Sequence, residues 1–583
     1  MRFLSNKNLT LPFLIALVTF ITYLPALNND FVNWDDPTYV YENPHLQLLN
    51  LDFIEWAFSS VYFSNWHPLT MISYALDYSI WGLNPFGYHL TNIFFHACNT
   101  FLVFVLVVRL IECQPNSPIP LFNKEGVRGR YPSSLVAASV TALLFGIHPI
   151  HVESVAWVSE RKDVLCAFFF LLALLVYLRY VSAKTRTSLL YSLCLLLFAM
   201  ALLSKPMAVS FPVVLLILDF YPLKRFRAGD EKIKRILAEK LPFFLFSLLS
   251  SLMTVWAQYL GGSLKPLEIY PLTTRFFVAM WAILFYLSKM LIPLDLAPFY
   301  PYPSQITATH IGAFILVSGL IAYCIKNRLL TAVWSYYIIT LIPVIGIVQV
   351  AGFAAADRYT YLPSIGPFML AGIAISLLIE GYSRYKKAVV AVLAGLTVLT
   401  VSMTIKQIEV WRDSITLWSH EIKIYPDFYS SYYSRGNAYI KLNRYDEVIS
   451  DYTKAIELNP KYLDAYNNRG NIYFDLGNYQ AALSDYNKAL ELNPLDSQVY
   501  TNRGNAYLGL GDYAQAIKNH DRAIELNPND ATAYNNRGAA YFRSGNYAHA
   551  IRDFSRAVEL DPQFTDAYNN LQAADRSFKA IDR

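Results

Sequence analysis

The sequence predicts an all-α protein in two parts. Residues 1–408 form a polytopic bundle of about eleven transmembrane helices, and residues 409–583 form a solenoid of helical repeats. Of the 583 residues, 55% are hydrophobic and 16% are charged, a composition too apolar for one soluble body. Apolar runs long enough to cross a bilayer recur in the first part, and prolines recur at a fixed interval in the second.

The first apolar run, Leu9 to Leu27, follows Arg2 and Lys7 and lacks a small-residue cleavage site. We expect an uncleaved transmembrane helix whose far end lies outside the cytoplasm. Further apolar runs cover residues 89–111, 133–149, 163–181, 188–204, 207–222, 241–260, 275–293, 309–325, 329–349, 364–381 and 388–406.

Positive charges between these runs set the orientation, because cytoplasmic loops are enriched in lysine and arginine. Simple alternation places the positive charges within 109–130, 179–186 and 224–240 inside, but it places Lys326, Arg328 and the cluster 384–387 outside. We therefore interpret one segment within 241–325 as re-entrant or peripheral. Eleven spans remain, and the C-terminal part lies on the same side as the first external loop, residues 28–88.

The C-terminal part is periodic. Pro426, Pro460, Pro494, Pro528 and Pro562 follow one another at intervals of 34 residues. Within the second interval, the spacing of small, aromatic and proline residues is typical of the tetratricopeptide repeat: Tyr466, Gly470, Tyr473, Ala482, Tyr486, Ala489 and Pro494. We expect four full repeats over 429–562, capped by helices over 411–425 and 563–583.

Two rows of asparagines follow the first helices of the repeats: Asn437, Asn471 and Asn505 in one row, and Asn468, Asn502 and Asn536 in the other. A side-chain amide both donates and accepts hydrogen bonds, so such rows are suited to the backbone of an extended acceptor peptide. The arrangement resembles the asparagine ladder of protein O-GlcNAc transferases. The alternative is that asparagine is only a soluble, neutral surface residue.

The first external loop holds the acidic pair Asp35 and Asp36, flanked by Trp34 and Pro37. Carboxylates at a membrane surface lose hydration unless a cation or a proton meets them, so we interpret this pair as the chemical centre. The alternative is a solvated turn, because aspartate before proline is a common turn former.

Four polar stretches, 65–68, 148–153, 159–163 and 356–359, fall on the same side as the acidic pair. Ionisable groups are costly at membrane depth, and their convergence predicts a shared polar cavity. Taken singly, each stretch is also compatible with interfacial anchoring. The sequence has no metal-ligand spacing, its five cysteines read as core residues, and its net charge of +5 without a basic run gives no sign of nucleic-acid binding.

The stretches HPLTMISYALDY, NPFGYHLTNIFFH, HPIHVESVAWVSERKDVL, SKPMAVSFP and ADRYTYLPSIG occur in this order ahead of the repeats. Together they resemble the transmembrane and tetratricopeptide-repeat O-mannosyltransferases, and the segment His148 to Asp163 is the most specific part. The resemblance implies a membrane glycosyltransferase of the GT-C class. Such an enzyme takes a sugar such as mannose from a polyprenyl-phosphate donor and gives it to an acceptor, here a protein hydroxyl, outside the cytoplasm.

In that class an acidic pair in the first external loop holds the catalytic base, which carries the role onto Asp35 and Asp36. We expect Asp36 to be the base, because Pro37 biases the residue before it toward an extended backbone and only one of two alternating carboxylates can face the sugar. Asp35 would then hold the loop or the sugar hydroxyls.

The departing phosphate needs cations, and we expect them to come from Arg161, Lys205 and Arg358. His148 and His151 would donate or relay protons, with Glu153 orienting one of them. No cofactor or bound metal is expected, although a divalent cation held by carboxylates stays open. A first helix that is both signal and anchor fits a bacterial inner membrane, and fits the endoplasmic reticulum nearly as well.

Two other functions stay open. An oligosaccharide ligase or polymerase can also carry repeats of this kind, but it depends on a large late external loop, whereas the longest external loop here is the first and is acidic. A non-enzymatic membrane scaffold would recruit partners through the repeats. Eleven spans exceed what an anchor needs.

Overall fold

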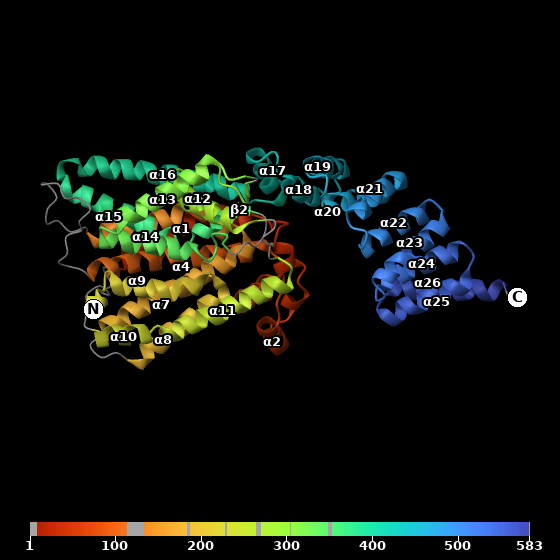
Figure 1. Ribbon diagram of the computed structural model, residues 1–583, viewed down its shortest axis with the longest axis horizontal. Coiled ribbons are helices and arrows are strands. Elements are labelled where there is room, and N and C mark those ends of the chain that lie inside the picture. The colour runs from red at the N-terminus through yellow and green to blue at the C-terminus, as the bar shows by residue number, and fades with distance from the viewer. Residues whose placement is uncertain are drawn as a thin grey trace. The chain divides into compact units, whose positions relative to one another are not determined.

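The computed structural model describes residues 9–113, 133–183, 187–227, 230–263, 270–303, 305–347 and 353–581. The predicted inside charges within 114–132 and 184–186, together with Arg2 and Lys7, lie outside these ranges. The chain forms two compact units, Met1–Ile424 and Tyr425–Arg583. Both are helical, which confirms the all-α class (Figure 1).

The helices of the first unit are α1 (Thr10–Tyr23), α2 (Leu51–Ser59), α3 (Pro68–Trp81), α4 (Pro85–Glu112), α5 (Ser134–Ile147), α6 (Val152–Ala156), α7 (Arg161–Ser182), α8 (Ser188–Ser204), α9 (Phe211–Phe220), α10 (Asp230–Ala238), α11 (Leu241–Leu260), α12 (Leu272–Leu291), α13 (Ala308–Cys324), α14 (Arg328–Leu341), α15 (Ile365–Gly381), α16 (Lys386–Val410) and α17 (Ser414–Ile424). Strands β1 (Tyr300–Pro301) and β2 (Phe353–Ala355) pair antiparallel.

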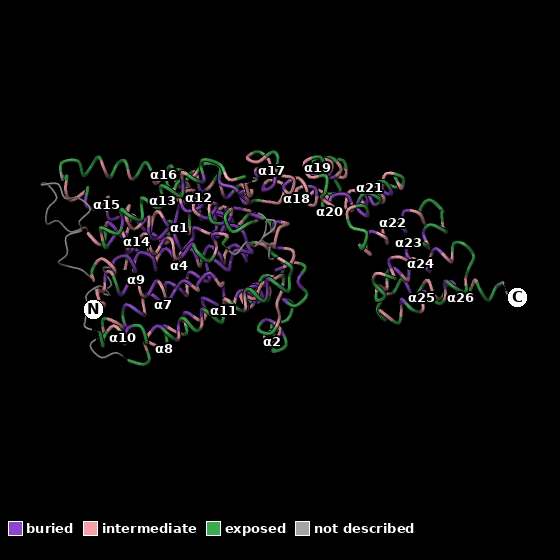
Figure 2. The backbone as a smooth tube through the Cα atoms, in the orientation of Figure 1, coloured by how far each residue is buried: buried purple, intermediate pink, exposed green. Residues whose placement is uncertain are grey.

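Each predicted apolar run is a helix, and most of these helices lie side by side in one bundle (Figure 1). Among the described residues, six helices are long and apolar enough to cross a membrane, and α5 with residues 149–156 makes a seventh that is bent by 50°. Helices α4 and α7 are mostly buried, whereas α16 is an exposed apolar helix at the edge of the bundle (Figure 2). An apolar surface of this kind is suited to lipid.

Both ends of helix α12 contact other segments of the first unit. The preceding helix α11 ends beside the first loop, where Gln258 donates to Asn65 at 3.3 Å. Near the start of α12, Arg275 donates to the carbonyl of Ile347 at 3.4 Å, and near its end the carbonyl of Met290 lies 3.0 Å from a ring nitrogen of His148. Helix α12 is unbroken and is one of the helices long and apolar enough to cross a membrane, so the re-entrant segment within 241–325 stays a prediction.

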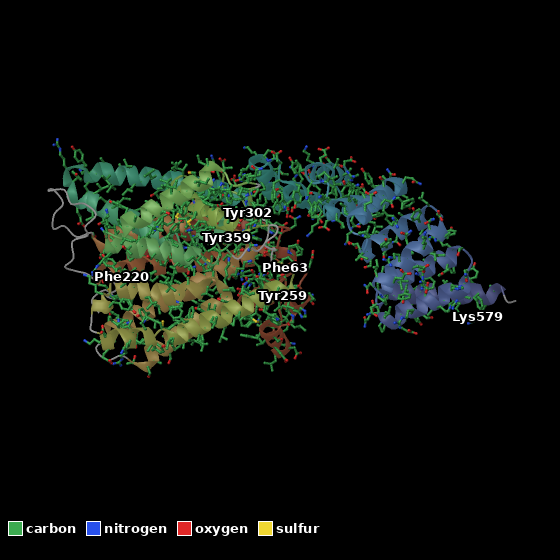
Figure 3. The ribbon with its side chains drawn as sticks, in the orientation of Figure 1. Phe63, Phe220, Tyr259, Tyr302, Tyr359 and Lys579 are labelled. Atoms are coloured by element: carbon green, nitrogen blue, oxygen red, sulfur yellow. The ribbon has the colours of Figure 1, made fainter. Side chains whose placement is uncertain are left out.

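The positive residues that simple alternation places outside, among them Arg328, lie at the end of the bundle opposite the first loop. The guanidinium of Arg328 sits 5.9 Å from the ring of Phe220, which marks that end in Figure 3. Glu380, near the end of α15, accepts from the backbone of Ser133 at the start of α5. Helix α16 then runs back toward the first loop, because Asn29 of that loop donates to the carbonyl of Ile408 near the end of α16 at 3.3 Å. The first loop and the end of the last apolar helix therefore share one end of the bundle.

The helices of the second unit are α18 (Tyr429–Ile440), α19 (Tyr445–Leu458), α20 (Leu463–Asp475), α21 (Tyr479–Leu492), α22 (Ser497–Gly509), α23 (Tyr513–Leu526), α24 (Ala531–Arg543), α25 (Tyr547–Leu560) and α26 (Thr565–Ile581). The repeat glycines allow the paired helices to approach. A Cβ added at Gly470 would lie 2.7 Å from the ring of Tyr486, and one added at Gly504 would lie 2.6 Å from His520. The four repeats and the closing helix fall where the proline spacing predicts them.

One boundary differs from the prediction. The helix expected over 411–425 as a cap for the repeats is present as α17, but it belongs to the first unit. Its buried residues Leu417 and Trp418 pack there, and Trp418 contacts Trp34 of the first loop in a tilted arrangement with ring centroids 5.6 Å apart. The units therefore divide after Ile424 and not after residue 408.

Candidate active site

The Asp36 carboxylate is buried and saturated with hydrogen bonds. One oxygen accepts from the backbone N–H of Val32 at 2.9 Å. The other accepts from both the backbone N–H of Ser159, at 3.0 Å, and its hydroxyl. Burial raises the pKa of Asp36 to about 7, although these hydrogen bonds oppose the rise. Asp36 thus ties the first loop to the helical turn Val158–Glu160 that precedes α7.

Asp35 lines a cavity of about 910 Å³ at the same end of the bundle. The other ionisable side chains of its wall include His67, Glu160, Lys162, Lys205 and Arg358. Phe63 and Tyr359, labelled in Figure 3, also line it. The Asp35 side chain keeps 18% of its surface exposed, and its carboxylate lies 3.7 Å from the Lys162 ammonium. Burial raises the pKa of Asp35, and Lys162 opposes that rise.

The backbone at Asp36 differs from the one expected. The prediction assumed an extended backbone at Asp36, but its φ of −61° and ψ of −34° are helical, and Pro37 to Tyr41 continue as a helical turn. The three hydrogen bonds to Asp36 outweigh the bias that a following proline imposes. Asp36 holds the loop and Asp35 is the carboxylate that reaches the cavity, whereas which of the two acts as the base stays a prediction.

Glu160 gathers the three cations of the cavity. Its carboxylate lies 2.9 Å from Lys205, 3.1 Å from Lys162 and 3.4 Å from Arg358. Lys205 also contacts Asp163 at 2.6 Å. An ion-paired network of this density holds each long side chain in one position, and it lowers the cost of burying several charges together.

Cations and acids alternate on the cavity wall. Three cations, Lys162, Lys205 and Arg358, line it together with the acids Asp35 and Glu160. Two further acids contact these cations, because Arg358 also pairs with Glu153 and Lys205 with Asp163. Burial, with the nearby cations, lowers the pKa of His67 to about 3, so this residue adds no charge near neutral pH. The wall thus offers both a carboxylate and fixed cationic groups.

Arg161, one of the three predicted phosphate ligands, lies elsewhere. Its side chain is fully buried, and it donates to Asp77 at 2.5 Å, to Asn92 at 2.7 Å and to the carbonyl of Tyr88 at 2.7 Å. These partners belong to α3 and α4, so Arg161 joins the start of α7 to two neighbouring helices. The next residue, Lys162, occupies the cavity instead, because successive residues of a helix point about 100° apart.

The two predicted histidines also join structural elements. His148 contacts the carbonyl of Met290 at 3.0 Å and accepts from the backbone N–H of Ile150 at 3.2 Å. His151 lies between the carbonyl of Phe145, at 2.8 Å, and the hydroxyl of Ser364, at 3.0 Å. Both rings are buried within the bundle. Both ring nitrogens of each histidine already have a hydrogen-bond partner within the protein, which argues against the predicted role as proton donors or relays.

Glu153 orients Arg358 and not a histidine. Its carboxylate accepts from the backbone N–H of Arg358 at 2.8 Å and from the guanidinium of the same residue. Arg358 and Lys205 line the cavity as predicted. The arginine also lies over aromatic rings, 5.3 Å from Trp34 and 5.6 Å from Trp157. These two indoles stack with centroids 4.3 Å apart and form part of the same wall.

The residues after the last apolar helix hold the first loop in place. The Trp418 indole donates to the side chain of Asn33 at 2.7 Å, and the backbone N–H of Asn33 donates to the hydroxyl of Ser414 at 2.8 Å. The backbone N–H of Asp30 donates to the carbonyl of Arg412 at 2.8 Å. Helix α17 is therefore part of the framework that positions the acidic pair.

In the second unit, the predicted asparagines are engaged with one another and with tyrosines. Asn502 donates to Asn467 at 3.0 Å, and Asn536 donates to Asn505 at the same distance. Further contacts join Asn468 to Tyr433, Asn471 to Tyr486, and Asn437 to Tyr452. These hydrogen bonds link helices within and between repeats, a role the sequence pattern did not reveal.

Among the described residues, no cluster of three or more histidine, cysteine, aspartate or glutamate side chains is arranged to hold a metal ion. The site residues that the sequence reasoning missed are Lys162, Glu160 and His67. All three lie within the polar stretches 65–68 and 159–163, so the composition of the sequence located them. Which residues of a stretch face the cavity depends on the direction in which each side chain leaves its helix or turn.

Comparison with known proteins agrees with this description. Models of the tetratricopeptide repeat match residues 463–495 and 531–564, and related TPR repeat models match 436–477 and 504–545. The human protein O-mannosyl-transferase TMTC4 is 25% identical over 472 residues, which cover 71% of this chain and 61% of the human protein. The chain is similar to the protein O-mannosyl-transferases. The resemblance noted in the sequence is thereby confirmed.

A second relative, the Drosophila melanogaster protein O-mannosyl-transferase Tmtc1, is 30% identical over 215 residues, covering 36% of this chain and 22% of that protein. The chain thus spans less than two thirds of the length of these relatives. The crystal structure of MamA protein is 24% identical and covers 26% of this chain and 82% of MamA, with a TM-score of 0.25.

The position of Arg161 leads to a first prediction. Arg161→Met leaves Asp77 buried without its cation, and we expect a loss of about 3–5 kcal/mol of stability, the range for breaking a buried pair. Thermal unfolding of the full chain in nanodiscs measures this. The matched control, Arg412→Met, removes an arginine whose side chain is 63% exposed and should change the unfolding temperature little. An unchanged unfolding temperature for Arg161→Met would return Arg161 to the list of candidate ligands.

Proposed function

We propose that the first unit is a GT-C-type glycosyltransferase that moves a hexose from a polyprenyl-phosphate donor to a hydroxyl group of a protein acceptor. Mannose is the sugar that the names of the relatives suggest. The observation that carries the proposal is the shared cavity, in which the Asp35 carboxylate faces the ammonium groups of Lys162 and Lys205 and the guanidinium of Arg358.

The carboxylate suits the acceptor side of this reaction. The acceptor oxygen forms a new bond to the anomeric carbon, and the bond from that carbon to the donor phosphate breaks. The hydroxyl proton passes to Asp35, and the electron pair of the broken bond leaves with the phosphate. General-base catalysis of this kind contributes about 10²- to 10⁴-fold to a rate.

The cations suit the donor side. The polyprenyl phosphate gains negative charge as it departs, and cationic groups already fixed in the wall stabilise that charge without first reorganising water. Lys205 and Arg358 are the groups we assign to the phosphate, with Arg358 fixed by Glu153 and both held by Glu160. The stacked indoles of Trp34 and Trp157 offer flat apolar surface to the C–H face of a sugar ring.

The topology supports a site outside the cytoplasm. Arg328 lies at the end of the bundle opposite the acidic pair, and Arg384 follows α15 at that same end. Positive charges mark the cytoplasmic end of a membrane protein. We place the cavity and the repeats outside the cytoplasm of a bacterial inner membrane, where a repeat array can present an acceptor peptide to the enzyme.

The function is tested with the full chain in nanodiscs, polyprenyl-phosphate mannose as donor and a serine- and threonine-rich peptide as acceptor. We expect mannosylated peptide by mass spectrometry. A matched reaction with a nucleotide-sugar donor should yield none, because the proposed leaving group is a lipid phosphate. Transfer from the nucleotide sugar, or release of free mannose with no transfer to any hydroxyl, would contradict the proposal.

The charge near Asp35 leads to a prediction about pH. The base must be ionised, so turnover falls as the pH drops through the pKa of Asp35, which burial raises above its ordinary value. Lys162 holds that pKa down, and Lys162→Gln should therefore move the acidic limb of the kcat/KM profile to higher pH.

The control for the pH profile is Lys234→Gln, which removes an exposed lysine of α10 and should leave the profile unchanged. A profile of Lys162→Gln that coincides with the parent, or that moves to lower pH, would show that another group sets the acidic limb.

A further inference from the structure

Glu421 carries a buried carboxyl group that the proposed reaction does not use. It lies on α17, the last helix of the first unit, and it is fully buried. Among the described residues, neither oxygen of this carboxyl group completes a hydrogen bond. An unpaired polar group is costly to bury, and an unpaired charge is far more costly. The structure therefore accommodates Glu421 best with a proton on its carboxyl group.

The nearest charged groups raise the cost of ionising Glu421. They are Asp357, which precedes Arg358 of the cavity wall, and Glu153 of α6, and both are acids. The Asp357 carboxylate accepts from the hydroxyl of Tyr300 at 2.8 Å, and Glu153 pairs with Arg358. The negative charge of either acid opposes a second negative charge at Glu421.

The cationic groups nearby are engaged elsewhere. The charge of Lys289, near the end of α12, acts on Asp357, and its ammonium donates to two backbone carbonyls of residues 294–295. The ring of His420, which precedes Glu421 on α17, contacts the carbonyl of Leu296 at 2.9 Å. Within the described part of the chain, Glu421 has no cationic partner to offset its burial.

This environment ties the protonation of Glu421 to the packing of α17. Burial raises the pKa of Glu421 to about 8, Asp357 and Glu153 add to the rise, and the backbone N–H of Phe299 opposes it. In water the same group has its ordinary pKa of about 4.5. A helix that leaves the bundle between these two pH values gives up one proton. The packing of α17 therefore weakens as the pH rises through this window, and it weakens no further above about pH 8.

Helix α17 also holds the first loop. Trp418, three residues before Glu421, donates to the side chain of Asn33 at 2.7 Å, and the hydroxyl of Ser414 accepts from the backbone N–H of Asn33 at 2.8 Å. Residues three apart lie on one side of a helix, and Trp418 and Glu421 are both buried. Movement of the Glu421 side of α17 into water therefore breaks the contacts that position the loop of the acidic pair.

We propose that Glu421 is a positioning residue that holds α17 against the rest of the first unit as an uncharged acid, and that loss of its proton releases α17 and the first loop together. Low pH then holds the loop in place, and higher pH loosens it. The device acts through packing and does not depend on sugar transfer, so it is tested without measuring activity.

Hydrogen exchange of the full chain in nanodiscs measures this release. Mass spectrometry reads the exchange, and each rate is divided by the intrinsic rate at the same pH. From about pH 5.5 to about pH 7.5 we expect the protection of α17 to fall about tenfold per pH unit, because one proton is lost on release. The backbone amides of Asp30 and Asn33, which donate to Arg412 and Ser414, should lose protection in step with α17.

Two substitutions remove the titrating group. Glu421→Gln keeps the size of the side chain, and Glu421→Met serves where a buried amide prevents folding. Both side chains are uncharged at every pH, so the protection of α17 should stay constant over the same range. The control Glu409→Gln removes an exposed acid of α16 and should keep the pH dependence of the parent.

Protection of α17 that does not change with pH in the parent protein would overturn the proposal. So would a pH dependence that persists in the Glu421 variants, because another acid, such as Asp357, would then be the titrating group. A dependence that is lost in Glu409→Gln as well would show a response to overall charge and would also overturn it.

Discussion

The hydrogen bonds between Asp36 and Ser159 are the contact on which the candidate site depends. Asp36 belongs to the first loop and Ser159 to the turn that begins α7, 123 residues later. Each is followed or preceded by a residue of the cavity wall: Asp35 stands directly before Asp36, and Glu160 directly after Ser159. A single buried carboxylate thereby sets the distance between the candidate base and the residue that gathers the cations.

A second support acts on the same loop. Trp418 of helix α17 donates to Asn33, while the turn before α7 holds the loop through Asp36. Both supports come from segments remote in sequence, so the loop gains its conformation from tertiary contacts and not from local propensity. The energetic expense of burying so much charge is offset by pairing, since Glu160 alone contacts three cations.

The helices of both units could be predicted from the sequence, because the repeats recur at a fixed interval and the apolar helices are long runs of hydrophobic residues. A 34-residue interval fixes the repeats, and the length of the apolar runs predicts the helices of the first unit. The same signals did not predict that α17 packs in the first unit. The sequence of a short helix does not specify which of two neighbouring units it packs against.

The site was predictable in composition but not in detail. The stretch 159–163 was recognised as polar, yet which of Arg161 and Lys162 faces the cavity depends on where α7 begins, and a boundary error of one residue reverses the assignment. The extended backbone expected at Asp36 was wrong for a related reason. The rule for a residue before proline describes an isolated chain, and the three hydrogen bonds to Asp36 override it.

The division of labour between the two carboxylates is tested most directly by comparing Asp35→Asn with Asp36→Asn in single-turnover transfer assays on the full chain, with thermal unfolding measured in parallel. The account predicts that Asp35→Asn unfolds normally and loses about 10²- to 10⁴-fold in the transfer rate, as expected for a missing base. Asp36→Asn should lower the unfolding temperature, because an amide cannot accept all three hydrogen bonds. Near-normal transfer by Asp35→Asn, alongside an Asp36→Asn variant that is stable and inactive, would contradict the account.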